Sequence, residues 1–132
     1  IIIVMHILIR STCMNIRDNF KKGYVEMLIL NFLSEKDLYG YEMTQLVIER
    51  GGGYIKIPEG SLYPTLYKLE DKHMISSYQK QVGKRLKRIY YHLEDQGLEY
   101  LNELIKEYYA VNECITKILE FSKGAKDENN VE

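Results

Sequence analysis

Four cationic side chains lie close together in the second half of the chain, at Lys84, Arg85, Lys87 and Arg88. Lysine and arginine at this density favour phosphate binding, because affinity for nucleic acid depends on cations placed along the phosphate backbone. The alternative is a solvated hairpin tip, where Lys and Arg are also common. The whole chain has a formal net charge of -1, but residues 54–93 hold eight Lys/Arg against three Asp/Glu. This local excess favours phosphate contact.

A second candidate group lies on a helix predicted to begin at Ser61, whose hydroxyl can cap it. Leucines at spacings of four and three bury one side of this helix, so its other side can reach base edges or nearby phosphates. Tyr63 is the first candidate for base contact, and the alternative is a tyrosine packed in the core. Because the helix has neither Arg nor Asn, specificity is expected to depend on DNA shape. The predicted base-reading residues are Ser61, Tyr63, Thr65 and Lys68.

The other reactive side chains form no catalytic or metal-binding set. An enzyme of this kind would need a nucleophile paired with a base, and a zinc site would need ligands at workable spacing. The terminal segment offers Glu99, Glu103 and Glu107 but no histidine after His92. We therefore expect no catalytic residue, no metal site and no cofactor. The side chains considered are Cys13, Cys114, His6, His73 and His92.

Cysteine usage and hydropathy indicate where the protein works. Two cysteines without CxxC spacing are typical of a reducing compartment, so a cytoplasmic location is expected. The apolar stretch Ile1–Ile9 is shorter than the roughly 20 residues of a membrane span, and it lacks the basic start of a secretory signal. No membrane association is expected. Residues 1–15 are expected to be an N-terminal extension, either an added upstream segment or a helix or strand docked on the core.

Hydrophobic periodicity predicts three helices, a β-hairpin and a long terminal helix, in that order. The first helix is apolar on nearly every side and is predicted to be buried, and the second ends at Gly51–Gly53. Two segments in which apolar and polar residues alternate predict a β-hairpin, and the four cations lie at its tip. The predicted fold class is mainly α with a small β-hairpin (α+β), with one domain over residues 16–93. The predicted elements of this domain are 24–33, 39–50, 61–72, 75–82 and 88–93.

The terminal helix, predicted over residues 94–122, has a coiled-coil-like seam with apolar spacings of three and four. Dimerisation through this seam is favoured over packing back onto a domain whose three helices already cover one hairpin. Asn112 either fixes the register of the seam or is a lone surface residue. Residues 123–132 are polar and are expected to be disordered. The predicted dimerisation residues are Leu98, Leu101, Ile105, Tyr108, Asn112, Ile115 and Leu119.

Three motifs occur in order along the chain: LYGYE at 38–42, GSLYPTLYKLE at 60–70, and RIYYHL at 88–93 followed by Gly97. Together they resemble the PadR family of transcriptional regulators over roughly residues 16–121. The resemblance implies a winged helix-turn-helix dimer that binds double-stranded operator DNA with its third helix in the major groove. It also implies a hairpin, the wing, near the DNA backbone, and a long terminal helix that makes contacts across the dimer.

The resemblance further implies repression and a small hydrophobic or phenolic effector, for which Tyr108 and Tyr109 lie where a dimer cavity could form. Two positions depart from the family pattern. His73 stands where glycine is usual, at a left-handed position that histidine adopts less easily. Glu94 replaces a threonine and is a poorer helix cap. The predicted function is a sequence-specific, ligand-responsive, homodimeric DNA-binding repressor; the alternatives are a winged-helix metal sensor and a protein-interaction module without operator binding.

Overall fold

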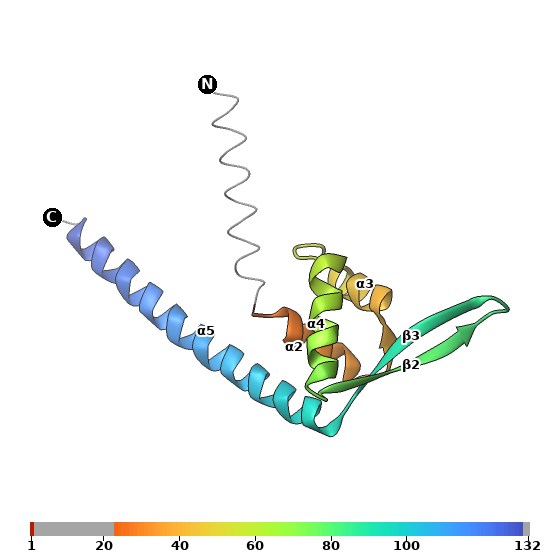
Figure 1. Cartoon of the computed structure of the whole chain (residues 1–132). Coiled ribbons are helices and arrows are strands. Elements are labelled where there is room, and N and C mark those ends of the chain that lie inside the picture. The colour runs from red at the N-terminus through yellow and green to blue at the C-terminus, as the bar shows by residue number, and fades with distance from the viewer. Residues whose placement is uncertain (2–22, 131–132) are drawn as a thin grey trace.

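The structure is a computed structural model that describes residue 1 and residues 23–130. It confirms the predicted fold class, a mainly helical winged helix-turn-helix domain followed by a long C-terminal helix (Figure 1). The extension predicted at residues 1–15 lies, apart from residue 1, outside the described residues. The elements in chain order are α2 (Val25–Leu33), β1 (Leu38–Tyr39), α3 (Gly40–Arg50), α4 (Glu59–Asp71), β2 (Ile75–Val82), β3 (Leu86–Leu93) and α5 (Asp95–Asn129).

One apolar core lies between α2, α3, α4 and the base of the sheet. Ile29 and Leu30 of α2, Met43 of α3, and Leu62 and Leu66 of α4 are all buried in it. The two leucines are four residues apart, which places them on the same face of α4. Figure 1 shows the three helices grouped together, with the β2–β3 hairpin projecting to one side and α5 leaving on the other.

The sheet contains a strand that the sequence did not predict. Its order is β1-β3-β2, all antiparallel, and β1 pairs Leu38 with Tyr91 and Tyr39 with Tyr90. Successive side chains of a strand point to opposite faces. Tyr91 therefore faces the core and is buried, whereas Tyr90 lies on the outer face. Residues 75–93, which include β2, β3 and the turn between them, are called the wing below.

The terminal helix is longer than the sequence predicted. We expected disorder from residue 123, but α5 continues to Asn129. Alanine, lysine and glutamate are good helix formers, and Lys126 lies in the last turn, where a cation stabilises the negative end of the helix dipole. Only Gly97 and Leu101 of α5 are buried, so most of the helix extends beyond the domain (Figure 1).

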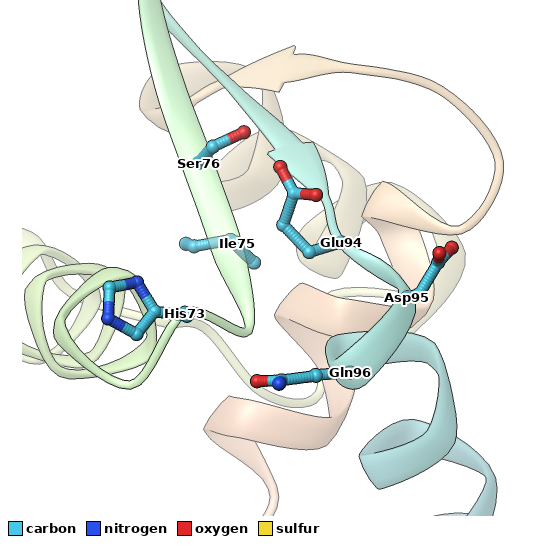
Figure 2. Close-up of a pocket in the computed structure, with 6 residues that line it drawn as sticks. All are labelled: His73, Ile75, Ser76, Glu94, Asp95 and Gln96. Carbon is cyan, nitrogen blue, oxygen red and sulfur yellow. The ribbon is translucent and has the colours of Figure 1, made fainter.

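The start of α5 is held against the turn between α4 and β2. The Glu94 amide donates to the Met74 carbonyl oxygen at 3.0 Å, and Gly97 packs against the same peptide group. As expected for a poor cap, the Glu94 side chain makes no capping hydrogen bond. An open pocket of about 380 Å³ marks this junction, with His73 on one side and Gln96 on the other (Figure 2). It is lined by His73, Ile75, Ser76, Glu94, Asp95 and Gln96.

His73 occupies a left-handed backbone position, with φ of 61°. It follows the end of α4 in a Schellman motif, in which the Met74 amide donates to Leu69 O at 2.9 Å and the His73 amide donates to Glu70 O at 3.0 Å. Glycine is the usual residue at this position because a Cβ atom is strained there. The departure noted in the sequence is thus a strained residue inside an otherwise regular helix end.

We expect His73→Gly to raise the free energy of unfolding by about 0.5–1 kcal/mol, because relief of left-handed strain exceeds the extra entropy of glycine in the unfolded chain. Urea unfolding followed by circular dichroism measures the change. His73→Ala is the control, since it removes the imidazole but keeps Cβ. Equal stability of the glycine and alanine variants would contradict the argument.

Candidate nucleic-acid interface

Tyr63 joins the two helices of the helix-turn-helix. A Cβ atom at Gly40 would lie 2.9 Å from the Tyr63 hydroxyl oxygen, so the tyrosine ring lies directly over the start of α3. This close approach explains why a glycine opens α3. Tyr63 nevertheless remains 48% exposed. Its packing role and its predicted base contact are therefore compatible, because about half of the residue's surface stays in solvent.

The structure gives two other predicted base-reading residues partners within the domain. Thr65 donates its hydroxyl hydrogen to the Ser61 carbonyl oxygen at 2.7 Å. Lys68 Nζ lies 3.1 Å from Glu26 Oε1, so this cation is directed toward α2. Ser61 is exposed in the first turn of α4. The predicted helix cap at Ser61 is wrong, because α4 begins at Glu59 with Pro58 as its N-cap and has no side-chain capping hydrogen bond. The structure therefore keeps Ser61 and Tyr63 accessible and ties Lys68 to its own domain.

Glu26 connects three helices. Its carboxylate pairs with Lys68 of α4 and accepts a hydrogen bond from the Tyr100 hydroxyl of α5 at 2.8 Å. Burial alone would raise the pKa of Glu26, but the contacts with Tyr100 and Lys68 outweigh it and hold the pKa below its usual value. The same hydrogen bond raises the pKa of Tyr100. Glu26 is thus a charged link between α2, α4 and α5.

Two exposed tyrosines were missing from the predicted site. Tyr67 lies one turn after Tyr63 on α4 and is 78% exposed, and Tyr41 on α3 is 60% exposed. The signal was in the sequence, because Tyr67 falls away from the side of α4 that holds Leu66. Both side chains are candidates for DNA contact, since tyrosine can bind phosphate through its hydroxyl and base methyl groups through its ring.

The wing projects from the domain and carries the cations at its tip. The chain turns at Gly83, whose φ is 73°, and Lys84, Arg85 and Lys87 are exposed. None of these three cations forms an ion pair with any residue that the structure describes. Arg88 differs, because its guanidinium carbon lies 4.4 Å from the centre of the Tyr39 ring. Three of the four predicted phosphate-binding residues are therefore available at the tip, and Arg88 is held nearer the domain.

The predicted dimerisation residues of α5 fall into two groups. Leu101 is buried in the core of its own domain, Ile105 is partly buried against it, and Tyr108 packs edge-on against Tyr24 at 5.2 Å between ring centres. The predicted dimer role of Leu101 thus conflicts with its packing, because the first turns of α5 cover α2. The exposed part of the seam lies at its two ends, at Leu98, Ile115 and Leu119, and Asn112 is partly exposed.

The described residues include no group of three or more His, Cys, Asp or Glu side chains placed to hold a metal ion. Within the same part of the chain, no helix is both long enough and apolar enough to cross a lipid bilayer.

A family model described as the Transcriptional regulator PadR-like family matches residues 29–103. A relative described as uncharacterized protein X, from Lysinibacillus sphaericus, is 36% identical over 105 residues, which is 80% of this chain and 96% of the relative. The negative transcriptional regulator PadR of Bacillus subtilis is 28% identical over 87 residues, 66% of this chain. This chain spans only 48% of that longer protein.

Solved structures agree with this match. A transcriptional regulator from Clostridium thermocellum superposes with a TM-score of 0.70 at 30% identity, covering 75% of this chain and 96% of its own. The Bacillus subtilis PadR structure, solved in complex with operator DNA, gives a TM-score of 0.56 at 29% identity and covers 61% of this chain and 45% of its own. The chain therefore belongs to the PadR-like family of transcriptional regulators and is not an enzyme.

Proposed function

We propose that this protein is a cytoplasmic, sequence-specific DNA-binding repressor that acts as a homodimer. The observation that carries the proposal is the exposed cationic wing tip, formed by Lys84, Arg85 and Lys87, next to a helix-turn-helix. The family relative from Bacillus subtilis is a negative regulator and was solved with operator DNA. By analogy, α4 enters the major groove with Ser61 and Tyr63 near base edges, while the wing contacts phosphates.

A second copy of the chain is the expected partner of α5. The distal half of this helix exposes Val111, Ile115, Ile118 and Leu119 on one side, at spacings of three and four. Isolated helices are marginal in water, and most helix stability comes from packing an apolar face. Burial of this face against its twofold mate accounts for both the length and the pattern of α5. Asn112 lies beside the face and can fix its register.

The effector proposal is supported by a cluster of tyrosines between α2 and α5. Tyr108 contacts Tyr24 and Tyr109, each at 5.2 Å between ring centres and in edge-on geometry. Aromatic side chains pack well against planar apolar molecules. We propose that a small hydrophobic or phenolic effector binds beside this cluster in the dimer and releases DNA. Titration of the DNA complex with a panel of small phenols tests this step.

Fluorescence anisotropy of labelled duplexes tests DNA binding directly. The purified protein is titrated, over a salt series, against DNA from its own promoter region, against operator sequences selected from a random pool, and against a scrambled duplex. Preferential, salt-dependent binding with one dimer per site supports the proposal. Equal and weak binding to every duplex would instead favour a protein-interaction module that has kept the fold without operator recognition.

We expect Lys84→Ala/Arg85→Ala to weaken binding to all duplexes and to flatten the salt dependence. Each phosphate contact contributes about 0.9 to the slope of log affinity against log salt, so the double variant should lose roughly 1.8. Discrimination between operator and scrambled DNA should change little, because phosphate contacts carry no sequence information. Lys123→Ala/Lys126→Ala, at the end of α5, removes the same charge far from the wing and is the control. An unchanged slope in the wing variant would exclude its tip from the interface.

A further inference from the structure

Asp37 ties both strands of the wing to the helix-turn-helix. It lies in the turn between α2 and β1, and its carboxylate contacts one residue from each wing strand. Tyr78 of β2 donates its hydroxyl hydrogen to Oδ2 at 2.7 Å. His92 Nδ1 of β3 lies 2.7 Å from Oδ1. These bonds join positions 41 and 55 residues apart in sequence.

A layer of aromatic rings extends this connection along the outer face of the sheet. Tyr78 stacks on Tyr90 with 5.8 Å between ring centres, and Tyr90 meets Tyr39 of β1 edge-on at 5.5 Å. Arg88 then covers the Tyr39 ring. All these side chains lie on one face because Tyr78, Tyr90 and Tyr39 are direct neighbours across the three strands. The layer therefore runs without interruption from Asp37 to Arg88, which lies between the domain and the tip of the wing.

Within the residues that the structure describes, the wing is otherwise attached to the domain only at its base. Strand β1 pairs with β3 at Tyr90 and Tyr91, and the rest of the hairpin pairs with no other strand among residues 23–130. At about 3.3 Å per residue, the tip lies roughly 20 Å from the row that contains His92. A tilt of about 10° at the base would move the tip by roughly 3 Å, which is the length of a hydrogen bond.

We propose that Asp37 is a positioning residue for DNA binding, whose two hydrogen bonds fix the angle of the wing and so place Lys84 and Arg85 against the phosphates. The proposal rests on the DNA-binding function proposed above. It predicts an effect opposite to that of simple electrostatics. Removing a carboxylate near DNA normally strengthens binding by reducing repulsion, whereas loss of this carboxylate should weaken binding by freeing the wing.

The bond to His92 makes the position of the wing depend on pH. The charged groups that act on His92 are Asp37 from the α2–β1 turn and Glu94 and Asp95 from the start of α5, and Tyr78 of β2 shares the Asp37 carboxylate with it. The hydrogen bond to Asp37 raises the pKa of His92 above its ordinary value of 6.5, and the charges of Asp37, Glu94 and Asp95 add to this. With Asp37 ionised, which its lowered pKa favours, the ion pair is fully formed below 6.5 and is lost as pH rises through the raised pKa of His92. DNA affinity should therefore fall as pH rises through the raised pKa of His92.

The test compares Asp37→Asn with Glu35→Gln in the anisotropy assay on the selected operator. Both variants neutralise one carboxylate of the same turn, but Glu35 pairs with Arg50 of α3 at 2.6 Å rather than with a residue of the wing. Asp37→Asn should bind about 10-fold more weakly, because misplaced wing cations lose charge-assisted contacts with phosphate. Glu35→Gln should bind as the wild type does or slightly more tightly. Equal or tighter binding by Asp37→Asn at unchanged stability would overturn the proposal.

Three further measurements separate positioning from general destabilisation. Thermal unfolding checks that both variants fold, and Tyr78→Phe removes only one hydroxyl from the network and should give a smaller loss of affinity. The pH profile of DNA affinity should move to lower pH in Asp37→Asn, because His92 loses its carboxylate partner. Residual dipolar couplings of wing amides should change in Asp37→Asn and stay unchanged in Glu35→Gln.

The dipolar couplings also distinguish this proposal from the function on which it rests. If the wild-type protein bound no DNA, the proposed function would fail, yet the couplings would still report whether Asp37 fixes the wing. Couplings that are the same in the wild type and in Asp37→Asn would overturn the positioning role, whatever the DNA result.

Discussion

Replacing Gly97 with alanine is expected to lower the free energy of unfolding by about 3 kcal/mol, at the upper end of the usual range for overpacking. A Cβ atom at this position would overlap the Met74 carbonyl oxygen and would lie 2.7 Å from Leu93 Cδ1. The obstacle is mainly backbone, which cannot rotate away as a flexible side chain can. The same Met74 oxygen accepts the hydrogen bond from Glu94 that starts α5. The clash therefore affects both packing and the hydrogen bond at the junction.

A glycine-to-alanine substitution elsewhere in α5 provides a control with the opposite expected effect on the free energy of unfolding. Gly124 has no neighbouring atom within 4 Å of where its Cβ would be. Gly124→Ala should therefore stabilise α5 by up to about 1 kcal/mol through helix propensity alone. Urea unfolding of both variants measures the two effects. Equal stability of Gly97→Ala and the wild type would contradict this prediction. It would mean that the start of α5 can move away from the Met74 peptide group without loss of free energy.

Replacing Ile115 with glutamate is expected to convert the proposed dimer to a monomer and to weaken operator binding at least about 100-fold. Ile115 is 47% exposed in the single chain and lies in the centre of the apolar face of α5. Burial of one such side chain contributes about 1.5–3 kcal/mol, and the twofold axis doubles the loss. Two separate monomers must then find two half-sites independently, so the high effective concentration of the second domain is lost.

Sedimentation equilibrium gives the mass, and anisotropy gives the affinity for the operator. Ala110→Glu is the matched control, because it adds the same charge to an exposed position on the opposite side of α5. It should leave both the mass and the affinity close to those of the wild type. A dimeric Ile115→Glu variant would mean that the two chains associate through another surface.

The order of helices and the wing could be predicted from the sequence because each depends on local signals. Leucine spacing marked α4, and Gly51–Gly53 marked the end of α3. Strand β1 was missed because it has only two residues, and its pairing with β3 depends on a segment about fifty residues away. The residues near β1 in the sequence therefore do not indicate that pairing.

In the candidate site, too, local features could be predicted from the sequence and contacts between distant residues could not. The cations of the wing tip were identified because they are close in sequence and need no partner to be exposed. Lys68 was assigned to DNA, but it pairs with Glu26, which lies on another helix. The contacts of Asp37 with Tyr78 and His92 could likewise not be predicted from the sequence, since they join three separate elements. Non-local pairs decide which polar residues of a helix remain available.

The position of Glu26 constrains how motion can pass through the molecule. One carboxylate holds Lys68 on the helix proposed to read DNA and Tyr100 on the helix proposed to join the two subunits. A rotation of α5 must therefore either break one of these bonds or carry α4 with it. In the proposed dimer, Glu26 would therefore couple a movement of α5 at the subunit interface to the position of α4, and so to the distance between the two DNA-binding domains.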